Sequence, residues 1–123
     1  MSYNTIQNGW TKATMKAAIR KYNNGTPAVD YNDEGVYSCE YKAKDGNRCA
    51  VGCFIPDGHE ALQSGEPASS LAADYPDLEK VLPILDADLI NSFQLTHDRC
   101  RESDADLHKT LDNWIDDALE DPK

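Results

Sequence analysis

The segment from residue 36 to 56 constrains the fold most, because two β-prone runs flank a hairpin-type turn, Lys44-Asp45-Gly46-Asn47. With Cys39 set directly opposite Cys53, the alternating apolar side chains of the two runs meet on one face. A slip of one residue would send one of the two sets to the opposite face. The pattern therefore predicts one antiparallel β-hairpin whose apolar face is covered by helices.

Apolar residues at helical spacing predict those helices on both sides of the hairpin. We expect a helix over 5–24, a short one from Ser69 or Ser70, one over 85–101, and a last one capped by Ser103. The buried stripes of the last two helices comprise Leu89, Ile90, Phe93, Thr96, His97, Cys100, Leu107, Leu111, Trp114, Ile115 and Leu119. The predicted class is α+β: an N-terminal helix, one antiparallel β-hairpin, then three or so packed helices.

The size of the chain leaves room for one hydrophobic core, so we expect a single domain over residues 1–123. No apolar run approaches the ~20 residues needed to cross a bilayer. The first residues lack the basic start and apolar stretch of a secretory signal. These observations predict a cytoplasmic protein that makes no contact with a membrane.

The net charge of −10 at pH 7 is unevenly distributed. The first 29 residues carry four basic residues and no acidic one, so the remainder is strongly acidic. Such a surface repels phosphate backbones, which disfavours nucleic-acid binding and favours a protein partner with a basic patch. An acidity that only confers solubility is the alternative interpretation.

The predicted last helix concentrates acidic side chains away from its apolar stripe. The candidate binding residues are Asp112, Asp116, Asp117 and Glu120. Acidic groups in the final turn of a helix are unfavourable against the helix dipole, by about 0.3–1 kcal/mol each at low salt. Helix stability therefore does not explain them, whereas a docking surface for a basic protein patch would. A merely solvated acidic face is the alternative.

The candidates for thiol or zinc chemistry are Cys39, Cys53, His59 and His97. On a straight strand Cys49 and Cys53 would lie about 13 Å apart, too far to share one zinc ion, whereas an opposed Cys39 and Cys53 could share one. His97 and Cys100 share an apolar stripe, which favours a place in the core over a nucleophilic pair. We therefore predict no catalytic residue and no cofactor. A small thiol- or zinc-dependent enzyme, or a metal-stabilised protein, is the alternative.

Residues 49–57, Cys-Ala-Val-Gly-Cys-Phe-Ile-Pro-Asp, resemble a motif of small uncharacterised proteins of tailed phages and prophages, Cys-x-Val/Ile-Gly-Cys-Leu-Ile-Pro-Asp after an aromatic-rich strand. A Leu-rich segment and a Gln-x-x-His-Asp helix follow in those proteins. The matching residues here are Leu71, Tyr75, Pro76, Gln94, His97 and Asp98. The resemblance covers roughly residues 36–100 and departs at Phe54. It implies a phage origin and action inside a bacterial host, with no activity or catalytic residue to carry over.

The sequence thus favours a phage accessory protein that acts in the host cytoplasm by non-enzymatic protein–protein binding, in host takeover or anti-defence. Its partner would be a host or phage protein with a basic patch. A minor virion component is a further alternative, beside the thiol or zinc protein named above.

Overall fold

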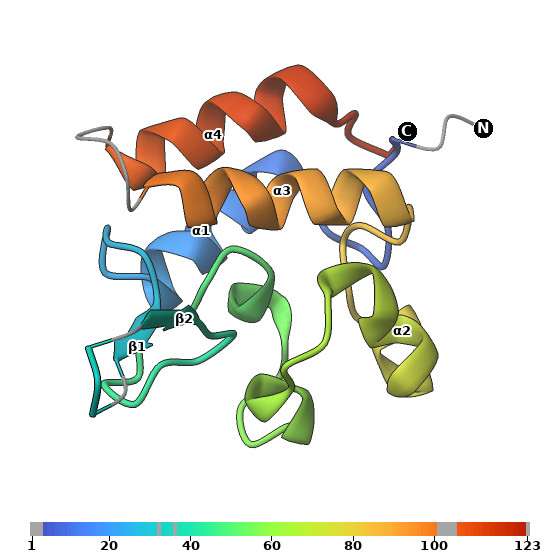
Figure 1. The fold of residues 1–123 in the computed structure, drawn as a ribbon. Coiled ribbons are helices and arrows are strands. Elements are labelled where there is room, and N and C mark those ends of the chain that lie inside the picture. Colours follow the sequence, from blue (N-terminus) through green and yellow to red (C-terminus); the bar gives the residue numbers. More distant parts are fainter. Residues whose placement is uncertain (1–3, 32, 36, 101–105, 123) are drawn as a thin grey trace.

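A computed structural model describes residues 4–31, 33–35, 37–100 and 106–122, over which the chain is mainly helical (Figure 1). The α-helices of the described part are α1 (Lys12–Tyr22), α2 (Leu71–Asp74), α3 (Ala87–Arg99) and α4 (Leu107–Ala118). The short 3₁₀ helices are η1 (Val51–Phe54), η2 (Glu60–Gln63), η3 (Ala68–Ser70) and η4 (Pro76–Lys80). The two strands are β1 (Val29–Tyr31) and β2 (Tyr37–Cys39).

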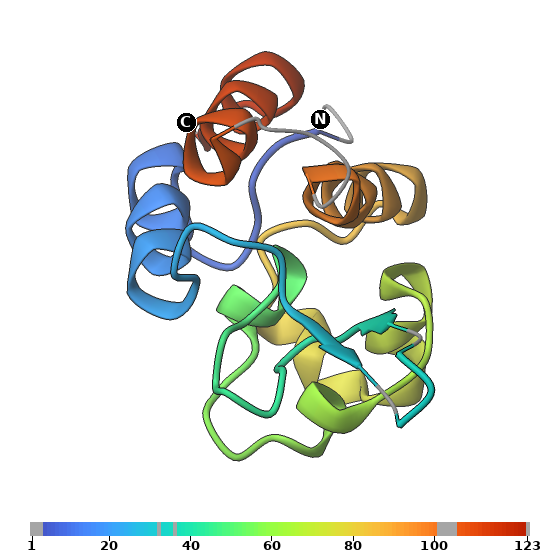
Figure 2. The ribbon, with the colours of Figure 1, turned by 60° about the vertical axis from the view of Figure 1, so that its left-hand side comes forward.

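The three long helices lie on one side of the molecule, and the short helices and loops between residues 40 and 85 lie on the other (Figures 1 and 2). α4 packs against both α1 and α3, and η1 packs against the same two helices from the other side. One cluster of buried apolar residues joins the two layers and includes Ile19, Val51, Leu82, Phe93 and Ile115. The fold is thus a helical layer over a compact, largely irregular one.

The predicted α+β fold with a hairpin over 36–56 is wrong. Cys39 pairs through its backbone with Val29 and not with Cys53. Cys53 lies in η1, so the second predicted strand is a 3₁₀ helix. The antiparallel pairing of β1 with β2 covers three residues of each strand. The molecule is therefore mainly helical.

The turn predicted at residues 44–47 does form, but extended pairing stops after one bridge. Lys42 and Arg48 form an isolated antiparallel bridge, inside which the Ala43 N–H donates to the Asn47 carbonyl at 2.8 Å. Beyond it the chain curls into η1. A run as short as residues 49–54 has the same apolar character in a strand and in a helical turn, so its periodicity does not distinguish the two.

α1 begins at Lys12, not at Thr5 as predicted. Thr11 is the N-cap, and its side chain and that of Thr14 form a reciprocal capping box. Upstream, Thr5 pairs in parallel with Glu120 near the end of the chain. The N-terminal apolar residues therefore reach the core from an extended segment.

The predicted helices over 85–101 and near the C-terminus are confirmed in their central parts as α3 and α4. Asp86 caps α3 and Asp106 caps α4, each side chain accepting the backbone N–H three residues further on. Ser103, the predicted cap of the last helix, lies outside the described residues. The short helix predicted from Ser69 or Ser70 corresponds to η3 and α2.

A row of four aromatic rings runs through both layers. Trp10 packs edge-on against Phe54 with ring centroids 5.0 Å apart, and Phe54 lies 5.9 Å from Phe93. Phe93 in turn lies 5.0 Å from Trp114 of α4. The row connects the N-terminal segment, η1, α3 and α4, and so fixes the position of α3 against the rest of the core.

Candidate binding groove beside α3

The described cysteine thiols are buried and free, on Cys49, Cys53 and Cys100. The Gly52 N–H donates to the Cys49 sulfur at 3.3 Å, and the Cys53 thiol donates to the Cys49 carbonyl at 3.2 Å. Burial raises the pKa of the Cys53 thiol to about 12, and it raises the pKa of Cys49 as well. The thiolate is the reactive form, so both thiols are inert at neutral pH. The side chain of Cys39 lies outside the described part.

His59, a candidate zinc ligand in the alternative interpretation, has both ring nitrogens in hydrogen bonds. Its Nδ1 accepts from the Ala61 N–H at 3.0 Å, so Nε2 carries the proton and donates to Asp77 at 2.7 Å. His59 therefore ties the start of η2 to η4. Over the residues that the structure describes, no group of three or more His, Cys, Asp or Glu side chains is placed to hold a metal ion.

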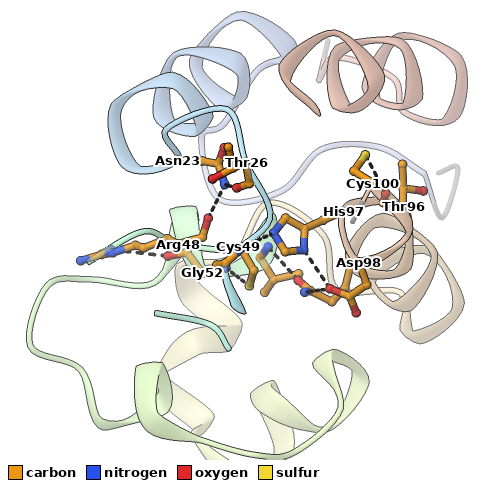
Figure 3. A network of polar contacts seen from close by, with 12 residues as sticks. Asn23, Thr26, Arg48, Cys49, Gly52, Thr96, His97, Asp98 and Cys100 are labelled. Carbon is orange, nitrogen blue, oxygen red and sulfur yellow. Dashed lines mark hydrogen bonds and ion pairs between the residues drawn. The ribbon is translucent and has the colours of Figure 1, made fainter. Parts of the chain in front are cut away.

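His97 is fully buried and belongs to a polar network (Figure 3). The Ala28 N–H donates to Nε2 at 3.0 Å, so the ring proton lies on Nδ1, which donates to Asp98 Oδ1 at 2.8 Å. The Gln94 amide donates to the same oxygen at 3.0 Å, and its carbonyl accepts from the Val51 N–H at 3.1 Å. Both nitrogens of His97 are thus used within the fold, and the ring positions the Asp98 carboxylate.

Asp98 connects this network to an open groove beside α3. One wall is the α3 face that carries Asn91, Leu95 and Asp98, and the opposite wall consists of residues 40–41 and 64–68. The groove has a volume of about 390 Å³. This is near the lower end of the roughly 300–1,000 Å³ found for ligand sites.

The lining of the groove combines acidic side chains with apolar ones. Its carboxylates belong to Glu40, Glu66 and Asp98, and its lining residues include no Lys, Arg or His. Tyr41 and Leu95 supply apolar surface, and Leu95 is 46% exposed although it is a large apolar residue. A ligand that complements this lining carries a positive charge on an apolar stem.

One hydrogen bond within the wall opposite α3, and one that ties this wall to α3, hold the groove in shape. The Tyr41 hydroxyl donates to the Glu66 carbonyl at 2.6 Å, which fixes the loop over residues 64–68. The Ser69 N–H donates to the Asn91 side-chain oxygen at 3.0 Å, which ties η3 to α3. The groove is therefore held in shape by contacts within the chain itself.

Of the binding residues predicted on the last helix, three lie on α4, whereas Glu120 lies beyond its end at Ala118 and forms the bridge with Thr5. The three on α4 are Asp112, Asp116 and Asp117. Asp112 accepts two hydrogen bonds from Arg20 at 3.0 and 2.6 Å, and Asp116 accepts one from Lys16 at 2.7 Å. The basic residues of α1 thus neutralise part of the acidic face. Asp117 and Glu120 are exposed and form no ion pair with the described residues.

Comparison of the chain with models of protein families, with curated proteins and with solved structures finds no match. None of the helices in the described part combines the length and the apolar character that crossing a bilayer requires.

Sequence reasoning missed the groove, because its acidic residues Glu40, Glu66 and Asp98 come from three separate segments. One signal was available on α3. Asn91, Leu95 and Asp98 recur at helical spacing on the side away from the buried stripe, with an exposed leucine among polar neighbours. This spacing places the exposed leucine and the Asp98 carboxylate on the same face of α3.

Proposed function

We propose that this protein is a phage accessory protein that acts in the cytoplasm of a bacterial host by non-enzymatic binding to a protein with a basic surface. The observation that carries the proposal is the preformed groove beside α3, which has three carboxylates and no basic side chain in its lining. On a chain with a net charge of −10, such a groove attracts and orients a basic partner. The resemblance of residues 49–57 to the phage motif supports the origin.

The environment of the candidate catalytic groups supports binding over catalysis. The thiols of Cys49 and Cys53 are buried, with pKa values raised by that burial. His59 and His97 use both ring nitrogens in hydrogen bonds within the fold. A nucleophile needs an adjacent free base, and none of these imidazoles is free to act as one.

The test is affinity capture from host lysate and from infected-cell lysate, with two variants of equal net charge. The groove variant is Glu40→Gln with Glu66→Gln, and the helix variant is Asp117→Asn with Glu120→Gln. We expect the wild type and the helix variant to capture the same protein. The groove variant should lose most of it, and capture should weaken as salt is raised because the attraction is electrostatic.

Two results would overturn the proposal. Failure of the wild-type protein to retain any specific protein at low salt would remove the binding function itself. Loss of the partner from the helix variant, with the groove variant unaffected, would move the binding site to α4.

A further inference from the structure

We propose that the groove receives a single arginine side chain from an extended segment of the partner, with its guanidinium on the Asp98 carboxylate. This inference rests on the proposed function and names the group that is recognised. Arginine combines a planar, permanently charged guanidinium, whose N–H groups can donate to a single carboxylate oxygen, with a long apolar stem.

The size and lining of the groove fit one such side chain. A volume of about 390 Å³ holds one long side chain with its flanking backbone. Leu95, which is 46% exposed, offers apolar surface to the stem, and the largely buried Tyr41 forms part of the opposite wall. Glu40 and Glu66 add negative charge, which favours further basic residues beside the arginine.

Asp98 is prepared for this contact by the buried network. Its Oδ1 accepts hydrogen bonds from His97 at 2.8 Å and from Gln94 at 3.0 Å. Its Oδ2 accepts none from the described residues, and the side chain is 29% exposed. One oxygen therefore fixes the orientation of the carboxylate while the other remains available to a donor that enters the groove.

Other ligand classes fit the groove less well. Phosphates and other anions are repelled by its three carboxylates, with no basic group to offset them. A metal ion needs several ligands within about 2.0–2.6 Å of one point, and the described residues contain no such group. An organic cation with an extended apolar stem is attracted by the three carboxylates and does not need a set of metal ligands.

The test measures binding of a capped Gly-Arg-Gly peptide to the full chain by NMR, through the shifts of backbone amide signals. The comparison peptide carries citrulline, which has nearly the shape of arginine without its charge. We expect saturable shifts confined to residues 40–41, 64–68 and 91–98, and at least tenfold weaker binding of the citrulline peptide. Shifts elsewhere, or equal binding of the two peptides, would overturn the inference.

Asp98→Asn is the decisive variant, because its Oδ1 still accepts from His97 and Gln94 while the charge is lost. We expect about tenfold weaker binding of the arginine peptide. Asp117→Asn removes the same charge from α4 outside the groove and should bind as the wild type does. Equal affinities for the two variants would contradict the proposal. If Asp98→Asn fails to fold, Glu40→Gln and Leu95→Ala, both at the rim, should each weaken binding, and unchanged affinity in both would count against it.

The outcomes separate this inference from the proposed function. A lysate protein captured through the groove, with no binding of the arginine peptide, would leave the function and remove arginine as the recognised group. Peptide binding at the groove without any captured protein would leave arginine as the recognised group and remove the proposed function.

Discussion

Gly52 lies at a close approach between η1 and the backbone of Tyr41. A Cβ at this position would lie 2.1 Å from the Tyr41 carbonyl oxygen and 2.9 Å from the carbonyl carbon. That oxygen accepts the Cys49 N–H at 3.2 Å, so it cannot move aside without breaking a hydrogen bond. Space, and not an unusual φ angle, therefore requires the glycine of the Cys-Ala-Val-Gly-Cys segment.

Gly52→Ala should therefore destabilise the fold. Overpacking against rigid backbone costs about 1–3 kcal/mol, and we expect a loss of at least this size in the free energy of unfolding measured with urea. Gly65→Ala is the matched control, because nothing lies within 4 Å of its added Cβ and its φ lies outside the left-handed region. A Gly52→Ala protein as stable as this control would show that the two backbones are not packed in this way.

Arg48 shows what a local pattern does not reveal about a single residue. It is 3% exposed, and its guanidinium donates to the Ile55 carbonyl at 2.8 Å and pairs with the Asp57 carboxylate. It also lies over the Tyr22 ring, 4.3 Å from the centroid. A charge in the core is tolerated when it is paired and hydrogen-bonded. The sequence places Arg48 beside a turn, where an exposed charge is expected, and its burial follows from contacts made at a distance along the chain.

At the scale of elements, the helices with long periodic stripes were predictable and the segment over 49–54 was not. α3 and α4 bury Phe93, Leu111 and Ile115, as their spacing indicates. In residues 49–54 the apolar run is short, and the Cys53 N–H donates to the Cys49 carbonyl at 3.1 Å, as in a helical turn. The two cysteines, four residues apart, fit that turn as well as they fit a strand. Packing of η1 against the backbone of Tyr41 favours the helical turn over the strand.

The ion pairs between α1 and α4 are a second feature of element scale. Lys16 holds the pKa of the exposed Asp116 carboxyl below its usual value, chiefly through their hydrogen bond. The pKa is lowered in the folded state, so the pair stabilises the fold above the unfolded-state pKa of about 3.9. That contribution is lost as the pH falls through the folded-state pKa. The acidic face of α4 is therefore in part an attachment site for α1.

Asp116→Asn should lower the melting temperature slightly at pH 7, because exposed pairs contribute little. The difference from wild type should shrink as the pH falls below about 3.9, where the wild-type carboxyl becomes protonated as well. It should also shrink at high salt. Asp117→Asn is the control, since it removes the neighbouring charge without breaking this pair. Equal effects of the two variants across the pH series would argue against a specific Lys16 contact.

At the scale of the whole molecule, the groove and the core depend on the same packing. α3 presents Phe93 and His97 to the interior and Leu95 and Asp98 to the groove, so one helix serves both. The faces of this helix could be predicted from its sequence. The opposite wall could not, because residues 40–41 and 64–68 meet α3 only after the chain has folded around η1 and η2. Which residues line the candidate site is therefore decided by the tertiary fold and not by any one segment of the sequence.

The row of four aromatic rings has a tryptophan at each end, so intrinsic tryptophan fluorescence can report on unfolding at both ends of the row. Trp10 lies at one end, its Nε1 donating to the Val81 carbonyl at 2.7 Å, and Trp114 lies at the other, its Nε1 donating to Ser92 at 3.2 Å. Trp114→Phe leaves emission from Trp10, which contacts Phe54 of η1 and Val81, and Trp10→Phe leaves emission from Trp114 in the helical layer. If the layers unfold as one cooperative unit, emission and far-ultraviolet circular dichroism should change at the same urea concentration in each variant. Separate midpoints in either variant would show that one layer loses its structure before the other.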